Sequence, residues 1–277
     1  MFHSTLPSIA EIIASTHVLS APDATTTVIK VGKRFAVKYG RRVTPIEAAN
    51  LDYLSANTTV PVPKLYAFMK QPETDRLFIV MEFIEGQTLE KLLPTLRTTE
   101  KQDVFDQIQE ALSQLRNLPA PDYLGSVGRQ AFGDGIFYTD PFDPAKSGPF
   151  ASQNEMNEGI LLRLAETCAP SHVRLLRTLI ESTLQPHRTV FTHADLQPKN
   201  IMVRRKGTKQ DGSGMFDILL IDWEMSGWYP EYWDFCNATV WDSFRPEWLE
   251  AVQNMMAVYP KEYLMVKTIR NILFLLG

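Results

Sequence analysis

The stretch that most constrains the fold of this 277-residue chain runs from Phe191 to Glu224. It reads FTHADLQPKNIMV, then a polar interval, and then FDILLIDWE. Short apolar runs typical of β-strands flank the polar FTHADLQPKN segment, and a third apolar run leads to Asp222. Turn-forming residues between Gly207 and Gly214 separate the last two runs. The pattern predicts a strand, a polar loop, a strand, a hairpin and a strand that ends at an acidic residue.

Polar residues in this stretch have the spacing His193-x-Asp195-x-x-x-x-Asn200, with Asp222 after the last apolar run. This spacing is typical of the catalytic loop and metal site of protein-kinase-like phosphotransferases. A carboxylate at Asp195 can accept the proton of an attacking hydroxyl. Asn200 and Asp222 offer the oxygen ligands that Mg²⁺ prefers. A His-x-Asp tripeptide also occurs by chance, so the surrounding strand pattern is what favours this interpretation.

Composition excludes several other classes of protein. Hydrophobic residues make up 44% of the chain, charged residues 22%, and the net charge is -4 with no basic run, so a nucleic-acid surface is not indicated. Cys168 and Cys236 are too few for a disulfide framework, and no signal-peptide pattern opens the sequence. No apolar run approaches membrane-spanning length. We therefore expect a cytoplasmic globular protein without a membrane partner.

The amino-terminal part is predicted to be rich in β-structure. Two β-like runs, Thr27 to Val31 and Arg34 to Tyr39, flank Gly32-Lys33 and predict a hairpin. Lys38 on the second run is comparable to the strand lysine that contacts the α and β phosphates of a kinase nucleotide. Exposed lysines are common on strands, so this interpretation of Lys38 depends on the catalytic loop downstream.

A helix is predicted after this hairpin, with Thr44 as its N-cap and Pro45 at its first position. Glu47 has two candidate functions there. It is the third residue after the cap and fits a capping box, which is a sufficient structural explanation. It could instead pair with Lys38 and aim the lysine at the phosphates, and we favour this ion pair.

The next two β-like runs, Leu65 to Met69 and Leu77 to Phe83, predict another antiparallel pair. The second run continues through three residues whose backbone groups would bind an adenine ring if this segment is an inter-lobe hinge: Glu82, Phe83 and Ile84. The alternative is a strand that simply runs into a loop. The sequence leaves both interpretations open.

The remainder of the chain is predicted to be mainly helical. Helical spacing or capping patterns occur in several stretches: Leu89 to Leu93, Val104 to Leu115, Ser152 to Thr167, Ser171 to Leu184, Asp234 to Phe244, Pro246 to Val258 and Lys261 to Leu276. A long segment from Pro119 to Phe150 is rich in Pro, Gly and aromatic residues, and we hypothesise that it helps to wall the acceptor pocket. Asp234 could hydrogen-bond the catalytic loop or stabilise a helix N-terminus.

Several segments together resemble the aminoglycoside phosphotransferase-like family, most closely its fungal members. The matching segments are AVKYG, TPIEAANLDYL, VPVPKLY, IVMEFIEGQTL, GPFAS, FTHADLQPKNIMV and LLIDWEMSGWYPEYWDF. The resemblance implies an α+β, bilobal protein-kinase-like fold, with a small antiparallel sheet lobe at residues 1–84 and a larger, mainly helical lobe at 85–277. It also implies ATP or GTP with Mg²⁺, and phosphoryl transfer to a small-molecule hydroxyl.

Site residues follow from this resemblance by position. Asp195 is then the catalytic base, Asn200 and Asp222 the magnesium ligands, and Lys38 with Glu47 the pair that orients the phosphates.

The chain departs from protein kinases at several positions. Ala194 replaces the arginine that pairs with a phosphorylated activation loop, which argues against that kind of regulation. Gln197 stands where protein serine kinases have a lysine, and Lys199 either reaches the γ-phosphate instead or is solvated. No Gly-rich loop is present, so Pro22 to Thr25 would have to cover the phosphates. A catalytically weak nucleotide-binding module is therefore the alternative to an active small-molecule kinase, and a protein kinase is disfavoured.

Overall fold

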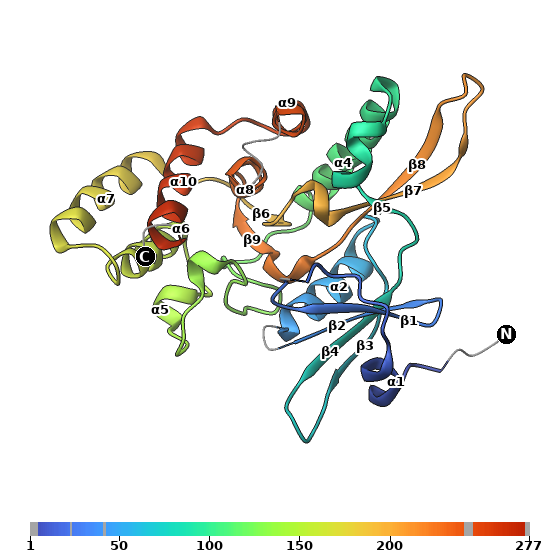
Figure 1. Ribbon diagram of the computed structural model, residues 1–277. Coiled ribbons are helices and arrows are strands. Elements are labelled where there is room, and N and C mark those ends of the chain that lie inside the picture. Colours follow the sequence, from blue (N-terminus) through green and yellow to red (C-terminus); the bar gives the residue numbers. More distant parts are fainter. Residues whose placement is uncertain (1–4, 23, 41–42, 241–245, 275–277) are drawn as a thin grey trace.

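The computed structural model of the chain describes residues 5–22, 24–40, 43–240 and 246–274. The amino-terminal segments form a lobe around one antiparallel sheet, and the rest of the chain forms a larger, mainly helical lobe (Figure 1). The α+β, two-lobed arrangement predicted from the sequence is therefore confirmed.

The sheet of the smaller lobe has the strand order β1-β2-β4-β3, with every pair antiparallel. Its strands are β1 (Thr27–Val31), β2 (Phe35–Gly40), β3 (Leu65–Lys70) and β4 (Leu77–Glu82). The predicted hairpin is present, and Gly32 has φ 60 in its turn, a conformation that glycine adopts without strain. Because β2 has a neighbour on both edges, it is an interior strand of the sheet.

Side chains of β2 alternate between the two faces of this sheet. Phe35 and Val37 belong to a small core with Ile12 of helix α1 (Ile9–Ala14). Ala36 and Lys38 point to the other face, where helix α2 (Pro45–Asn57) covers the sheet. The period of two along the strand thus directs Lys38 toward the interior between sheet and helix.

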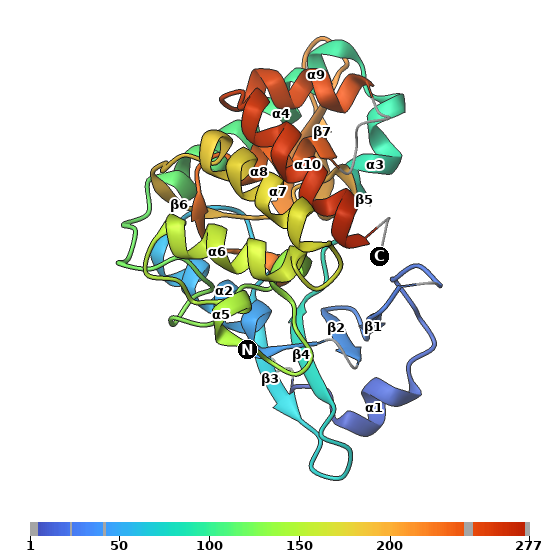
Figure 2. The same ribbon diagram turned by 90° about the vertical axis from the view of Figure 1, so that its left-hand side faces the viewer.

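The larger lobe contains the predicted helices, with ends that differ by several residues, and one further short helix between Pro119 and Phe150, where none was predicted. They are α3 (Leu89–Leu92), α4 (Thr98–Arg116), α5 (Pro144–Ser147), α6 (Gln153–Leu164), α7 (Pro170–Thr183), α8 (Trp233–Val240), α9 (Pro246–Met255) and α10 (Pro260–Phe274). Figure 2 shows α6, α7 and α10 stacked on the face that is turned toward the viewer. The predicted continuation of α8 to Phe244 lies outside the described residues. None of the described helices is long and apolar enough to cross a lipid bilayer.

Two small sheets hold the catalytic segments of this lobe. Strand β6 (Thr189–Thr192) pairs with β9 (Gly227–Pro230). Strand β7 (Ile201–Thr208) pairs with β5 (Gln87–Thr88) and with β8 (Gly214–Leu220), and the β7–β8 hairpin projects beside α4 (Figure 1). The strand, loop, strand, hairpin and strand order predicted from the sequence is confirmed.

The long segment from Pro119 to Phe150 contributes several buried residues to the core. Phe132, Phe137 and Phe150 are buried, and the Phe132 ring stacks on Tyr229 with 4.1 Å between ring centroids. The 3-10 turn η2 (Gly135–Phe137) and helix α5 shape this segment. Its aromatic residues therefore serve mainly to pack the segment against the helical lobe, whereas Tyr138, with 61% of its surface exposed, lies outside the core.

Candidate active site

Lys38 lies at the centre of a group of carboxylates between the two lobes. Its ammonium nitrogen Nζ is 2.8 Å from Glu47 Oε2, 2.5 Å from Asp222 Oδ1 and 2.7 Å from Glu224 Oε2. Only 5% of the lysine side chain is exposed. Burial by itself would lower the pKa of Lys38, but the three carboxylates outweigh it and raise that pKa well above its ordinary value. Lys38 therefore carries a positive charge in a site with an excess of negative charge.

The structure decides between the two interpretations of Glu47. Glu47 pairs with Lys38, and the side chain of Thr44 makes no capping hydrogen bond. The helix still begins at Pro45, as predicted. Burial raises the pKa of Glu47 to about 7, although the nearby Lys38 charge opposes this shift. Glu47 thus belongs to the ion cluster and not to a capping box.

The loop that carries Asp195 follows strand β6 and ends in the 3-10 turn η3 (Pro198–Asn200). Ala194 has φ 65, which a side chain with a Cβ atom rarely adopts. Both of its backbone groups are held by α8: the N–H donates to Asp234 Oδ1 at 3.0 Å, and the carbonyl accepts from Asn237 Nδ2 at 2.6 Å. The proposed contact of Asp234 with this loop is therefore confirmed.

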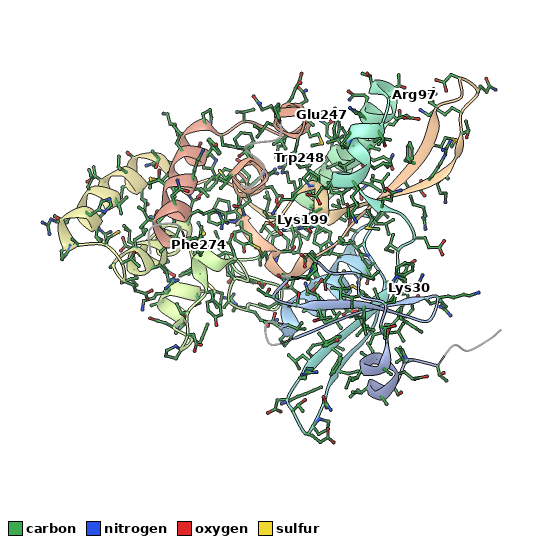
Figure 3. All side chains as sticks on the ribbon, viewed as in Figure 1. Lys30, Arg97, Lys199, Glu247, Trp248 and Phe274 are labelled. Atoms are coloured by element: carbon green, nitrogen blue, oxygen red, sulfur yellow. The ribbon has the colours of Figure 1, made fainter. Side chains whose placement is uncertain are left out.

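Asp195 is held within a network of hydrogen bonds. Its Oδ1 accepts from the Gln197 amide, and its Oδ2 accepts from Asn200 Nδ2 at 2.8 Å. Burial raises the pKa of Asp195; the Lys199 charge opposes the shift, and the Asp222 charge adds to it. Lys199 Nζ lies 3.9 Å from Asp195 Oδ2 with 50% of its side chain exposed, and Figure 3 shows it where the helical lobe faces the sheet lobe. Asp195 is thus oriented by two amides and partly shielded from water.

His193 was grouped with the catalytic residues on the basis of sequence, but its ring contacts the backbone. Nδ1 accepts from the Asp195 N–H at 3.3 Å, and Nε2 lies 3.0 Å from the Ile221 carbonyl. With Nδ1 as acceptor, the proton of a neutral ring is on Nε2, which then donates to Ile221. The ring is fully buried against Trp223. His193 therefore joins the catalytic loop to the Asp222 segment without reaching the cleft.

Asp222 follows β8 and begins the 3-10 turn η4 (Trp223–Met225) with φ 69. Burial pushes the pKa of Asp222 upward, but the Lys38 charge outweighs this effect and the pKa is lowered overall. The turn also brings Glu224 to Lys38, and oxygen atoms of Glu47, Asp222 and Glu224 lie within 4.8 Å of one another. Carboxylate oxygens are the ligands that Mg²⁺ prefers, so the donor atoms of this group fit the ion.

Two residues of this site were missed by the sequence reasoning. The sequence analysis assigns no role to Glu224, although the D-x-E spacing of Asp222 and Glu224 could have indicated that both carboxylates face the same cation. Asn50 was not noted at all: it is fully buried on α2, and its Nδ2 donates to the Trp223 carbonyl at 2.7 Å and to the Ser226 carbonyl at 3.1 Å. Helix α2 therefore positions both the lysine, through Glu47, and the Asp222 turn, through Asn50.

Asn200 lies beside the Asp222 segment, since the Ile221 N–H donates to the Asn200 carbonyl at 2.9 Å. The two predicted metal ligands therefore come from adjacent segments. The Asn200 side-chain nitrogen also donates to the Asp195 backbone carbonyl at 2.8 Å. Asn200 thus links the base to the acidic turn.

The three predicted hinge residues differ in what their backbone can offer. The Glu82 N–H donates to the Lys64 carbonyl at 2.9 Å, and the Phe83 N–H donates to the Arg34 carbonyl at 2.8 Å. Those two donors are therefore occupied by the sheet lobe. Within the described part of the chain, the N–H of Ile84 makes no such bond. Of the three predicted hinge residues, Ile84 is therefore the one whose backbone N–H is not used by the sheet lobe within the described residues.

The segment predicted to cover the phosphates connects two paired stretches of chain. Residues 17–20 run beside β1, with the Leu19 N–H 2.8 Å from the Val28 carbonyl and the Lys30 N–H 2.8 Å from the His17 carbonyl. The connection between them includes Pro22, Ala24 and Thr25, whereas Asp23 lies outside the described residues. The connection between residue 20 and β1 therefore lies at one end of the sheet. It contains no glycine, unlike a Gly-rich nucleotide-binding loop.

The fold and site define a class of protein. A strand lysine paired with a helix glutamate, a loop aspartate held by an asparagine, and an aspartate at the end of a β-hairpin are the parts of a kinase-like phosphotransferase. A family model described as "Phosphotransferase enzyme family" matches residues 24–263. The chain belongs to this family.

Solved structures support the same fold. The GDP and kanamycin complex of APH(2")-IIIa has a TM-score of 0.59 and 13% identity, covering 95% of this chain and 86% of that one. A GDP complex of aminoglycoside 2'-phosphotransferase-IIIa has a TM-score of 0.56 and 12% identity, covering 93% and 81%. A ternary complex of an APH(4)-Ia variant with ADP and hygromycin B has a TM-score of 0.54 and 13% identity, covering 95% and 85%. No curated protein matches the chain. The protein-kinase-like fold is therefore confirmed.

Proposed function

We propose that this phosphotransferase uses ATP or GTP with Mg²⁺ and transfers the γ-phosphate to a hydroxyl of a small molecule. The observation that carries the proposal is the convergence of Lys38, Asp195, Asn200 and Asp222 from separate segments on one site between the lobes. Phosphoryl transfer needs positioning and charge neutralisation more than covalent chemistry by the protein, and this set of residues supplies both.

Asp195 is proposed as the base. Its carboxylate would accept the proton of the acceptor hydroxyl and hold that oxygen in line with the phosphate. Gln197 and Asn200 fix the orientation of the carboxylate, and burial raises its pKa, which makes it a better proton acceptor than a solvated aspartate.

The acidic group is proposed to hold the metal. Asp222, Glu224 and Asn200 would be the ligands, and a bound Mg²⁺ would neutralise charge on the phosphate oxygens. Lys38 would then turn from Asp222 and Glu224 to the α and β phosphates, while Glu47 keeps it aimed. Glu82, Phe83 and Ile84 are proposed as the adenine-facing segment, with Ile84 as the donor. In this proposal residues 1–84 carry the nucleotide and residues 85–277 carry the acceptor.

The nucleotide requirement is supported by structural relatives that bind GDP or ADP, two of them together with an aminoglycoside. The chemical class of the phosphate acceptor has to be identified by experiment. The sharpest test follows labelled γ-phosphate from ATP, and separately from GTP, with Mg²⁺, onto a panel of aminoglycosides, choline-like alcohols, sugars and cell-extract metabolites.

Two variants make this test specific. Asp195→Asn should lower transfer roughly 100- to 10,000-fold, because it removes the proton acceptor and keeps the shape. Asp217→Asn is the matched control, since Asp217 pairs with Arg204 and Lys206 on the β7–β8 hairpin, outside the acidic group around Lys38. If the wild type transfers nothing while Mg²⁺ with nucleotide still raises its melting temperature, the chain is a nucleotide-binding module without turnover.

A further inference from the structure

The backbone of Ala194, directly before the proposed base, is clamped from both sides by one turn of α8. Asp234 and Asn237 are three residues apart on this helix and therefore lie on the same face. Asp234 accepts the Ala194 N–H at 3.0 Å, and Asn237 donates to the Ala194 carbonyl at 2.6 Å. Since Ala194 has φ 65, its conformation requires support from its surroundings.

Asn237 is itself held by a buried ion pair. Its Oδ1 accepts from Arg270 Nε at 3.2 Å and from Arg270 Nη2 at 2.8 Å. Arg270 on α10 pairs with Asp134 Oδ2 at 2.6 Å, and the same oxygen accepts from Trp233 Nε1 at 3.1 Å. Asp134, Asn237 and Arg270 have 0%, 0% and 3% of their surfaces exposed. The orientation of the Asn237 amide is therefore set by buried residues of other segments, Asp134 and Arg270.

The segment that carries Asp134 also touches the acidic turn. A Cβ atom at Gly133 would lie 2.0 Å from the Glu224 carbonyl oxygen, so only glycine allows this approach. Asp134 then caps the following turn η2 through the Ile136 N–H at 2.9 Å. Gly133 thus lies directly against the turn that carries Glu224. Asp134, the next residue, is linked through Arg270 and Asn237 to Ala194, the residue before the proposed base.

We propose that Asn237 is a positioning residue for the phosphoryl-transfer reaction, anchored by Arg270 and Asp134, and that it fixes Ala194 and thereby the placement of Asp195. The inference rests on the proposed function. An amide is the side chain that this position needs, because it donates to the carbonyl and accepts from the guanidinium at the same time. A carboxylate at this position cannot donate when ionised, and an apolar side chain does neither.

The test compares Asn237→Ala with Cys236→Ala, its neighbour on α8, which is also fully buried and is a free cysteine. Both variants are assayed with Mg²⁺ and ATP at a temperature at which each is folded. The two rates measured are phosphoryl transfer to the acceptor that the panel assay identifies and hydrolysis of ATP by water. Asn237→Ala should lower kcat roughly 10- to 100-fold with little change in the KM for ATP, because the base is displaced while the nucleotide site is intact. Cys236→Ala should leave kcat within about twofold of wild type.

Asn237→Asp provides a second, nearly isosteric variant that retains the acceptor for Arg270. Its kcat should be lower than that of wild type at each pH at which the introduced carboxyl group, next to the Arg270 guanidinium, is ionised, because an ionised carboxylate cannot donate to the Ala194 carbonyl. A ratio of the two kcat values that stays near one at every pH contradicts the proposal, as does an Asn237→Ala variant whose kcat matches that of Cys236→Ala.

A readout without turnover separates this inference from the proposed function. Hydrogen exchange of peptides covering residues 190–200 should be faster in Asn237→Ala than in wild type and Cys236→Ala. If the wild type transfers no phosphate, the proposed function fails, and this exchange measurement still decides the inference. Unchanged exchange in that segment overturns it.

Discussion

Two clusters of charged side chains among the described residues differ in charge balance and in burial. In the first, Lys38 contacts three carboxylates, those of Glu47, Asp222 and Glu224. In the second, Arg270 contacts the carboxylate of Asp134 and the neutral amide of Asn237. Counted over the described residues, the first cluster has one cation and three carboxylates, whereas these two contacts of the second join one cation and one carboxylate.

This difference indicates which cluster can exchange its cation for a ligand and which cluster has a fixed geometry. Asp222 and Glu224 expose 32% and 40% of their side chains and can exchange Lys38 for another cation or for water. Arg270 and Asp134 expose 3% and 0% and have no access to a ligand. An unbalanced, partly exposed cluster favours binding of a cation, and a balanced, sealed cluster favours a fixed geometry. The two clusters thus separate ligand binding from positioning.

Arg270→Met should produce the largest loss of stability. It removes the cation and leaves the Asp134 carboxylate buried without a charged partner, which lowers the free energy of unfolding by about 3–5 kcal/mol. Denaturant-induced unfolding measures this change. The double variant Asp134→Asn with Arg270→Met should recover part of the loss, because the uncompensated Asp134 charge is removed as well. A loss below about 1 kcal/mol in the single variant would show that the pair is not stabilising.

Lys38→Met should reduce activity strongly but stability only weakly, in contrast to Arg270→Met. Phosphoryl transfer should fall roughly 100-fold, since a positive charge that contacts the phosphates is removed. The loss of stability should be smaller than for Arg270→Met, because Asp222 and Glu224 can turn toward water and Glu47 can take up a proton. Transfer rates and denaturant unfolding of the two variants, measured side by side, test the contrast. Equal stability losses would contradict it.

The pH dependence of stability sharpens the comparison further. The pKa of Glu47 is raised to about 7 in the folded protein, whereas an unfolded chain has an ordinary glutamate. The folded state therefore holds a proton that the unfolded state releases, so the Glu47 contribution is fully present below about pH 4.5 and is lost as pH rises through about 7. The slope is at most about 1.4 kcal/mol per pH unit.

Glu47→Gln should remove this contribution. Denaturant unfolding between pH 5 and 8 should therefore show a difference between wild type and variant that decreases with rising pH. If the difference in free energy of unfolding between wild type and Glu47→Gln does not change with pH, Glu47 is not the group that titrates between pH 5 and 8.

Local sequence patterns were sufficient to select the individual candidate residues of the site. The strand position of Lys38, the helix start before Glu47 and the spacing of Asp195, Asn200 and Asp222 all follow from short stretches of sequence. The structure brings these residues together between the lobes, and their functional roles remain proposals. Most strands and helices were also predicted from periodicity, with ends that shifted by several residues, whereas the short elements β5, β9 and α5 were not predicted.

Contacts between distant segments could not be predicted in this way. Asn50 and Trp223 are 173 residues apart, and Asp134 and Arg270 are 136 apart. Asn50 and Arg270 lie within helical patterns, where a polar residue is most often solvated. Asp134 lies in a segment rich in glycine and aromatic residues, which we interpreted as a pocket wall. Only tertiary packing shows that each of these side chains has a buried partner.

Lys199 should give the smallest effect, because it belongs to neither cluster and is half exposed. Its charge lowers the pKa of Asp195, so in Lys199→Met the pKa of this base rises and the acid limb of the pH–rate profile moves to higher pH. Above that limb, transfer should change by less than about fivefold, as expected for an exposed ion pair. Lys206→Met, an exposed lysine on β7, should leave the profile unchanged. A roughly 100-fold loss in Lys199→Met at high pH would instead show that Lys199 contacts the transferred phosphate, in the place where protein kinases use the residue at Gln197.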